Sequence, residues 1–231
     1  MNLKQFTGYC YDEIAEELGF VRYLNGYYKV TNRAVASFFL EQYRGRRLVR
    51  PRMEIFPLCG VVPTSEDVTW TKQIESAYWR HTHTQPELAF SARTTQEEID
   101  NVRKILLDMF RVSEQPFLTR VLDLQTGFDA YCAYQDYHVA FTPVQNKYWT
   151  SPNYTCFLLA LKRYDTALQN YNAWAERVHK EYLSGNGVNE IAGSLHRLLA
   201  DKRYDEIDTM MQKREETNHA LLTRYHVLGV K

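Results

Sequence analysis

Five arginines within nine residues form the densest group of like charges in the chain. They are Arg44, Arg46, Arg47, Arg50 and Arg52, here called the arginine cluster. The planar forks of arginine suit phosphate and carboxylate groups, and the aromatic rings of Tyr43 and Phe56 flank the cluster, where they could stack on a base. The cluster predicts a site for an anion, a nucleic acid or an acidic partner. The alternative is an exposed turn and edge strand whose positive charge discourages edge pairing.

His81 and His83 form the tightest histidine pair. On a strand, residues two apart point to the same side, so both imidazoles could bind one metal ion. Glu87 or Glu98 would supply a third ligand. Because no third ligand follows at a diagnostic spacing, we expect loop histidines here, with a metal site or an enzyme's site as the alternative. We expect no cofactor.

Motifs for nucleophilic or phosphate chemistry are missing from the sequence. It contains no GxSxG, no GxxxxGK[ST] and no GxGxxG pattern. Cys59 precedes Gly60, and pairing of this thiol with a histidine is an open alternative. The four cysteines form no CxxC pair, so we expect them to be small buried apolar residues in a reducing compartment. The chain is expected not to be an enzyme.

Composition narrows the classes of partner. The 28 basic and 28 acidic residues give a net charge of zero, which argues against a protein that coats nucleic acid. No apolar run is long enough for a membrane span, and the polar start lacks the features of a signal peptide, so we expect a cytoplasmic protein. Aromatic residues reach 14%, with 17 tyrosines. Such a load predicts either thick aromatic packing on a sheet or a surface that docks another protein.

Hydrophobic periodicity predicts a helix over 3–18 that stops at Gly19, and then a group of strands. The strands are expected at 20–24, 27–31, 34–43 and 52–62, with Asn25-Gly26 as a two-residue hairpin turn. A short helix is expected within 65–80, and strand or loop over 81–93. Thr95 and Glu98 have the spacing of a capping box at the start of a helix over 95–110. A helix over 116–125 that ends at Gly127 should follow, then a loop over 128–152 with one strand near 137–141.

From residue 153 onward the chain is predicted to be helical. The tetrapeptide Lys-Arg-Tyr-Asp occurs at 162–165 and again at 202–205, a separation of 40 residues. Each copy follows an apolar helix end and precedes another helical segment, 167–182 or 207–225. This layout resembles tetratricopeptide-like helix pairs, although the period is longer than theirs. The alternative is local convergence on a favourable helix–turn–helix joint.

These elements predict an α+β fold in which an N-terminal helix packs on a mainly antiparallel sheet and the C-terminal half is helical. No linker rich in Pro, Gly or Ser divides the chain. We therefore expect a single compact domain over 1–231, with an α+β part at 1–152 and a helical part at 153–231.

The opening resembles uncharacterised bacterial α+β families in which a helix ends in a Leu-Gly-Phe step, here 18–20, and a tyrosine-rich hairpin follows, here 25–28. The tail is similar as well, with Asn218, Leu221, Leu222 and the final His226-Val227. The resemblance covers 1–60 and 202–231, and the arginine cluster and the middle of the chain do not follow it. Such families often accompany contact-dependent toxins as immunity proteins.

Together these observations favour a non-enzymatic protein-binding module, and the resemblance implies a bacterial immunity or antitoxin-like role. Another protein is the expected partner, whereas a membrane or a nucleic acid is not. The alternatives are a nucleic-acid or phospholigand binder that uses the arginine cluster, and an enzyme with a site near His81 and His83.

Overall fold

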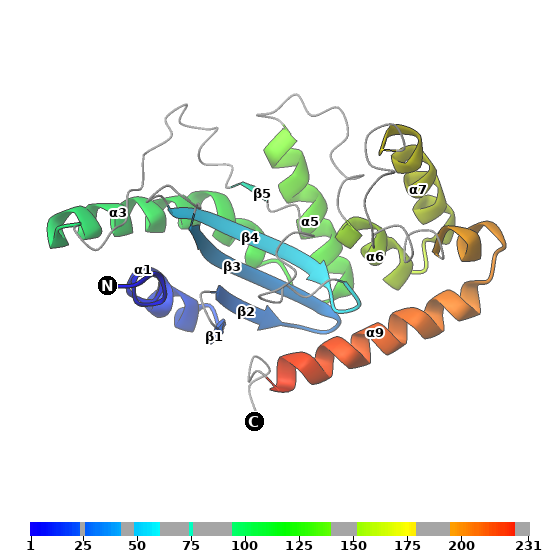
Figure 1. The fold of residues 1–231 in the computed structure, drawn as a ribbon, viewed down its shortest axis with the longest axis horizontal. Helices are drawn as coiled ribbons and strands as arrows, with labels where there is room; N and C mark the ends of the chain where they lie inside the picture. Colours follow the sequence, from blue (N-terminus) through cyan, green and yellow to red (C-terminus); the bar gives the residue numbers. More distant parts are fainter. Residues whose placement is uncertain are drawn as a thin grey trace.

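The computed structural model describes residues 1–23, 26–42, 49–60, 74–75, 94–139, 152–178 and 195–224. Its architecture is α+β, as predicted. Five antiparallel strands follow one another in the order β1-β2-β3-β4-β5, and helices pack against both faces of this sheet (Figure 1). The strands are β1 Val21–Tyr23, β2 Gly26–Val30, β3 Ala34–Gln42, β4 Val49–Pro57 and β5 Ile74–Glu75.

Three of the predicted strands are confirmed with small shifts, and the fourth is displaced. The strand predicted at 52–62 begins earlier, at Val49, and ends at Pro57, where a turn over 58–60 follows. Two residues of the helix predicted within 65–80 are instead strand β5, which pairs with β4. The rest of that segment and 81–93 lie outside the described residues.

The first hairpin is confirmed, but Gly26 belongs to strand β2 and not to the turn predicted at 25–26. The register sets Gly26 opposite Tyr23, so Gly26 is the first residue of β2 and not a turn residue. Asn25 itself is not described. Space around Gly26 is tight, because a Cβ there would lie 3.2 Å from the Tyr28 ring and 3.3 Å from the Phe39 Cβ.

The helices are α1 Leu3–Glu17, α3 Gln96–Met109, α4 Gln115–Leu118, α5 Leu124–Val139, α6 Pro152–Ala160, α7 Tyr164–Val178 and α9 Tyr204–Arg224, together with a short helix at 195–200. The predicted first helix and its stop are confirmed, and Gly19 has a φ of 73°. The capping box of α3 is present: Thr95 accepts a hydrogen bond from the Glu98 N–H, and Glu98 accepts one from the Thr95 N–H.

The helix predicted over 116–125 is wrong in its extent. A π-helical turn, Phe110–Glu114, continues α3 into the short helix α4, which ends at Leu118. Pro116 has no N–H to donate to the carbonyl of residue 112 and would clash with it in a regular α-helix. The wider π-helical turn directly before Pro116 accommodates this break.

The loop predicted over 128–152, with its strand at 137–141, is also wrong where the structure describes it, because α5 extends to Val139. Asp123 starts α5 by accepting a hydrogen bond from the Thr126 N–H at 2.8 Å. Gly127, predicted as a stop, lies inside this helix. An added Cβ at Gly127 would lie 2.9 Å from the Ala34 Cβ, so glycine here permits the close approach of α5 to β3.

Alternate residues of the sheet serve two separate cores. On β3, Ala36 and Phe38 face the larger core, which lies beneath α1, α3, α5 and α6. Val35 faces the opposite side, where it packs with Phe56 of β4 and with Leu222 of α9. The sheet is therefore covered on both faces, by several helices on one and by α9 on the other.

Hydrogen bonds made by Glu215 and Asn218 hold α9 against the sheet, and we call these bonds the α9 latch. Arg33, in the turn before β3, donates to both carboxylate oxygens of Glu215 at 2.7–3.0 Å. The Asn218 amide donates to the carbonyl oxygens of Leu58 and Gly60 at 2.7 and 2.8 Å. The latch joins the middle of α9 to the two turns at one end of the sheet.

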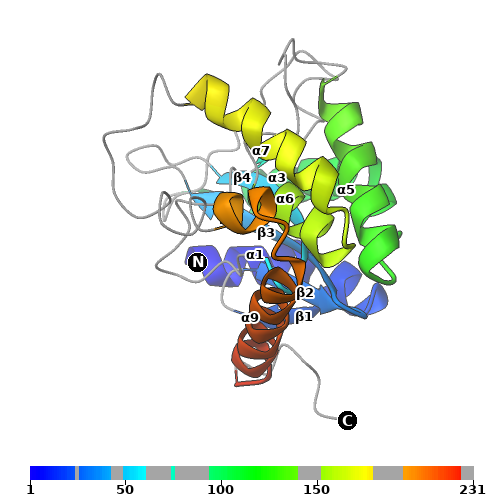
Figure 2. The ribbon, with the colours of Figure 1, turned by 90° about the vertical axis from the view of Figure 1, so that its right-hand side faces the viewer.

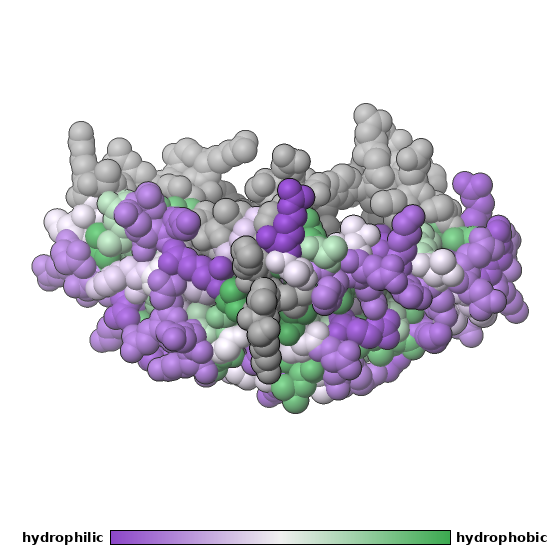
Figure 3. Space-filling view, turned by 90° about the horizontal axis from the view of Figure 1, so that it is seen from below, coloured by the Kyte–Doolittle hydropathy of each residue, from purple (hydrophilic) through white to green (hydrophobic). Residues whose placement is uncertain are grey.

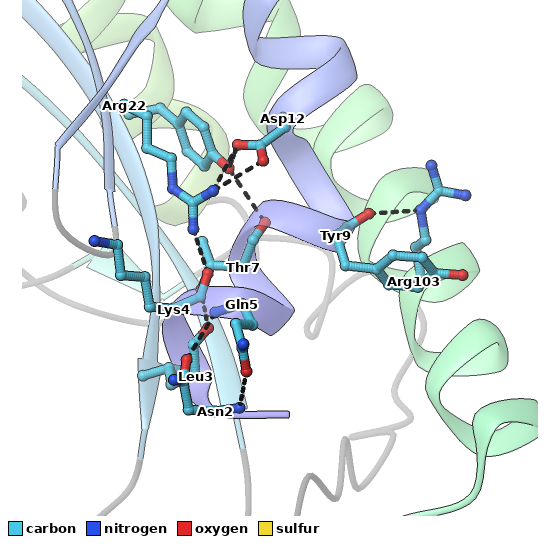
Figure 4. A network of polar contacts seen from close by, with 10 residues as sticks. Asn2, Leu3, Lys4, Gln5, Thr7, Tyr9, Asp12, Arg22 and Arg103 are labelled. Carbon is cyan, nitrogen blue, oxygen red and sulfur yellow. Dashed lines mark hydrogen bonds and ion pairs between the residues drawn. The ribbon is translucent and has the colours of Figure 1, made fainter.

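A polar network holds α1 between the sheet edge and α3 (Figure 4). Arg22 on β1 donates to both oxygens of Asp12 at 2.8 and 3.0 Å, and the Tyr27 hydroxyl donates to Asp12 at 2.6 Å. On the other side of α1, the Arg103 Nε donates to the Tyr9 carbonyl oxygen at 2.9 Å. These bonds set the position of α1 where its apolar face meets the core.

Seen from below, hydrophilic side chains dominate both flanks of the described surface, and hydrophobic ones gather toward its middle (Figure 3). The partly buried Tyr23, Val30 and Leu221 pack against the smaller core, on the sheet face that α9 covers. No described helix combines the length and apolar character that a membrane span requires.

We predict that Gly127→Ala destabilises the protein, although Ala is the better helix former. Helix propensity alone would raise the free energy of unfolding by about 0.5–1 kcal/mol. The 2.9 Å approach to Ala34 should instead lower it by about 1–3 kcal/mol, measured by urea unfolding. Adding Ala34→Gly should recover part of the loss, and Asp129→Ala on the exposed side of α5 is the control. A net gain for Gly127→Ala would contradict this account of the contact.

Candidate functional site

The arginine cluster lies only partly within the described residues. Arg44, Arg46 and Arg47 are outside them, whereas the backbones of Arg50 and Arg52 belong to β4. The register sets Arg50 opposite Glu41 and Arg52 opposite Glu75. Two members therefore occupy sheet positions whose backbone partners are acidic residues. The role of the cluster stays a prediction.

The predicted histidine pair cannot be placed, because His81, His83 and Glu87 lie outside the described residues. Glu98, the other suggested ligand, is described and is engaged in the capping box of α3. Within the described part of the chain, no group of three or more His, Cys, Asp or Glu side chains could hold a metal ion. The metal hypothesis therefore gains no support from Glu98.

The two copies of Lys-Arg-Tyr-Asp fold in the same way, and we call them joint 1 (162–165) and joint 2 (202–205). Each lysine adopts a left-handed backbone, with φ of 59° at Lys162 and 56° at Lys202. The N–H of the following arginine donates to a leucine carbonyl five residues back, at 2.8 Å in joint 1 and 2.9 Å in joint 2. This is the pattern of a helix end closed by a left-handed residue. Each joint thus ends one helix and starts the next with the same capping bond.

The joints also lie against each other at one end of the molecule (Figure 2). The rings of Tyr164 and Tyr204, equivalent residues of the two copies, stack with centroids 4.3 Å apart and an interplanar angle of 7°. His196 of the 195–200 helix stacks on Tyr171 of α7 at 4.6 Å, and its ring is 2.9 Å from the Asn172 amide oxygen. The two helix–turn–helix units therefore pack side by side, as units of helical-repeat proteins do.

Asp208 is the polar centre of this contact. It accepts hydrogen bonds from the Tyr164 hydroxyl and from the Lys162 ammonium, the latter at 2.6 Å. Partial burial acts to raise the pKa of Asp208, but these bonds outweigh it and hold that pKa below its ordinary value. Burial and the charge of Asp208 raise the pKa of Tyr164. At neutral pH the contact therefore unites an ionised aspartate, a neutral tyrosine and a lysine.

Lys162 and Lys202 have the same backbone conformation but differ in the contacts of their side chains. Their left-handed backbone costs a residue with a Cβ about 1 kcal/mol, which is why glycine is usual there. Lys162 gains the ion pair with Asp208. Lys202 is exposed, and its side chain has no bond to any residue that the structure describes. The backbone of Lys202 takes part in the helix cap, whereas its side chain adds no contact within that part of the molecule.

The alternative in which Cys59 pairs with a histidine is not seen among the described residues. Cys59, Cys10 and Cys156 are buried free thiols, as expected, while Cys132 is half-buried. The sulfur of Cys59 instead contacts Cys156, with a distance of 3.7 Å to its carbonyl oxygen. Because the two cysteines are 97 positions apart, sequence spacing carried no signal for this contact.

Comparison with protein-family models, curated proteins and solved structures gave no match to this chain. Without a related protein of known function, we infer a function from the described residues themselves, and in particular from the two stacked joints. Sequence reasoning found the repeated tetrapeptide, whereas Asp208 and His196 gave no local signal of their part in the contact.

We predict that Asp208→Asn destabilises the protein in a pH-dependent way. A folded-state pKa below the unfolded value stabilises the fold above the unfolded pKa, and this stabilisation is lost as the pH falls through the folded pKa. The loss in unfolding free energy should be about 1 kcal/mol at pH 7, because Asp208 is partly exposed, and should shrink below about pH 4. Asp108→Asn on α3 is the control. An equal loss at pH 3 and pH 7 would show that charge is not the cause.

We also predict that Lys202→Gly stabilises the protein by about 0.5–1 kcal/mol, since it relieves the left-handed backbone. Lys162→Gly should gain less because it also removes the 2.6 Å ion pair with Asp208. Chemical denaturation of both variants tests this order. Lys202→Ala keeps the Cβ and should bring no gain, so a similar gain for Ala and Gly would refute the strain argument.

Proposed function

We propose that this protein is a non-enzymatic protein-binding module whose partner contacts the end of the molecule where joints 1 and 2 lie. The observation that carries the proposal is the side-by-side packing of two equivalent helix–turn–helix units, through the Tyr164–Tyr204 stack. Stacked helix pairs build the extended surfaces that helical-repeat proteins use for binding. The two units here rest on a sheet, which supplies the support that a free pair of repeats would lack.

The side chains at the joints suit an interface. Tyr164 and Tyr204 are half-buried, so they offer rigid amphipathic surface between two rims of charge. Exposed residues of both signs lie close to them in the chain, namely Arg163, Asp165, Asp201, Lys202, Arg203 and Asp205. Tyrosine and arginine are enriched in protein interfaces, and a mixed charged rim favours specificity over non-specific attraction.

Lys202 is the residue that we assign to partner recognition. Its backbone is strained, and its exposed ammonium has no bond to the described part of the molecule. The left-handed backbone closes the helix end, but that cap does not require the lysine side chain, which is left available for a partner. An acidic group of the partner would supply the missing contact.

The finer proposal is a bacterial immunity or antitoxin-like role in the cytoplasm, with a toxin as the partner. Its support is the resemblance of 1–60 and 202–231 to families that accompany contact-dependent toxins. The second segment contains joint 2 and α9, so the proposed contact region and the resembling region overlap.

The test is native purification of the protein from its source cell, with mass spectrometry of what accompanies it. We expect a stoichiometric protein partner, whose identity would also decide the immunity role. A protein that purifies alone, and binds nucleic acid in a salt-sensitive way that Arg46→Ala with Arg47→Ala abolishes, would contradict the proposal.

We predict that Lys202→Glu weakens capture of the partner by about tenfold or more, since it repels an acidic contact. Lys202→Gly should also weaken capture even though it stabilises the fold, so the loss cannot be attributed to unfolding. Lys104→Glu makes the same charge change on α3, away from the joints (Figure 1), and should bind normally. Equal binding by Lys202→Glu and Lys104→Glu would exclude Lys202 from the interface.

A further inference from the structure

Three parts of the chain converge on the thiol of Cys59. It stands in the turn that follows β4, where the Gly60 N–H donates to the Pro57 carbonyl oxygen at 2.7 Å. The Asn218 amide of α9 bonds the carbonyl oxygens on both sides of it, those of Leu58 and Gly60. The backbone at Cys59 is therefore held on several sides, and its side chain points to α6.

On α6, the partner of Cys59 is Cys156. The Cys59 sulfur lies 3.7 Å from the Cys156 carbonyl oxygen, and the Cys59 thiol also hydrogen-bonds the Cys156 side chain. Both residues are buried and neither is in a disulfide. The two cysteines are therefore in contact, and a disulfide between them requires their sulfurs to move from contact to bonding distance.

The surroundings make the two thiols unequal. The hydrogen bond to Cys156, together with burial, raises the pKa of Cys59. The bond from Cys59 lowers the pKa of Cys156 against the effect of burial, and the positive charge of Arg214 on α9 adds to the lowering. Cys156 is thus the better nucleophile, and Cys59 is the thiol beside it that can act second.

We propose that Cys59 and Cys156 form a peroxide-oxidisable thiol pair that closes to an intramolecular disulfide between the turn after β4 and helix α6. The Cys156 sulfur attacks one oxygen of hydrogen peroxide, the O–O bond breaks, and the leaving hydroxide takes the thiol proton to become water. Cys156 is then a sulfenic acid. The Cys59 sulfur attacks the Cys156 sulfur, the S–O bond breaks, and hydroxide leaves with the proton of Cys59 as a second water. Two thiols lose two electrons, and one peroxide is reduced to two waters.

The chain contains its own controls. Cys10 is as buried as the pair, burial raises its pKa to about 12, and it is a free cysteine with no hydrogen bond to another cysteine among the described residues. Cys10 should therefore stay reduced. Cys132 is half-buried and could react independently, so the test uses the full chain with Cys132→Ser.

The experiment is treatment of the Cys132→Ser chain with hydrogen peroxide, alkylation of remaining thiols after unfolding, and tryptic mass spectrometry. We expect peptides 53–72 and 148–162 to be joined, with a mass about 2 Da below the sum of the reduced pair. Cys10 should be alkylated, and dithiothreitol should restore both thiols of the pair. This measurement needs no substitution in the core.

The order of the steps is tested by adding Cys59→Ser, which should trap Cys156 as a sulfenic acid that reacts with dimedone, whereas adding Cys156→Ser should leave Cys59 reduced. Two results would overturn the proposal. One is recovery of Cys59 and Cys156 as thiols at a peroxide concentration that oxidises Cys132 in the unaltered chain. The other is a disulfide that joins Cys10 or two separate chains. Neither result bears on partner binding at the joints.

Discussion

The ring of Phe38 joins four segments that are distant in the sequence, and the larger core is arranged around it. It packs against Phe110 of the π-helical turn at 4.5 Å, Tyr27 of β2 at 4.9 Å, Phe20 before β1 at 5.1 Å and Tyr11 of α1 at 5.4 Å. Aromatic pairs at these separations add to the burial of apolar area. A side chain in the middle of β3 thus sets where the first helix, the first hairpin and the end of α3 meet. Much of the aromatic load of the chain is used inside this core rather than on its surface.

The extent to which the fold could be predicted follows from how local each signal is. The helix α1, the capping box of α3 and the strand β3 were correctly predicted because periodicity and capping act within a few residues. The sequence does not indicate helix α5, because Gly127 has the appearance of a helix stop, whereas its role is to permit contact with Ala34, which is 93 positions away. The Asp123 and Thr126 pair was the local signal that could have found the start of α5. A single sequence does not distinguish a glycine that permits close packing from a glycine that forms a turn.

The same contrast applies to the candidate sites. A repeated tetrapeptide correctly indicated two similar joints, since the backbone of a helix end depends on neighbouring residues. Their mutual contact depends on Asp208 and on the stacking of Tyr164 with Tyr204, neither of which a repeat implies. The contact between Cys59 and Cys156 could be recognised only from the tertiary structure, because no sequence pattern links the two residues. The arginine cluster and the histidine pair remain sequence predictions, because most of their residues lie outside the described chain.

The α9 latch bears on the order in which parts of the molecule separate. Its bonds are polar and near the surface, with the Arg33 side chain 45% exposed, while Phe38 is almost wholly enclosed. Water and dissolved ions compete for the first kind of bond far more readily than for the second. The later part of α9 is therefore suited to lift from the sheet as a local event while the aromatic core stays closed. Amide hydrogens in the later part of α9 would then exchange through this local opening, whereas amide hydrogens around the aromatic core would exchange only when the whole molecule unfolds.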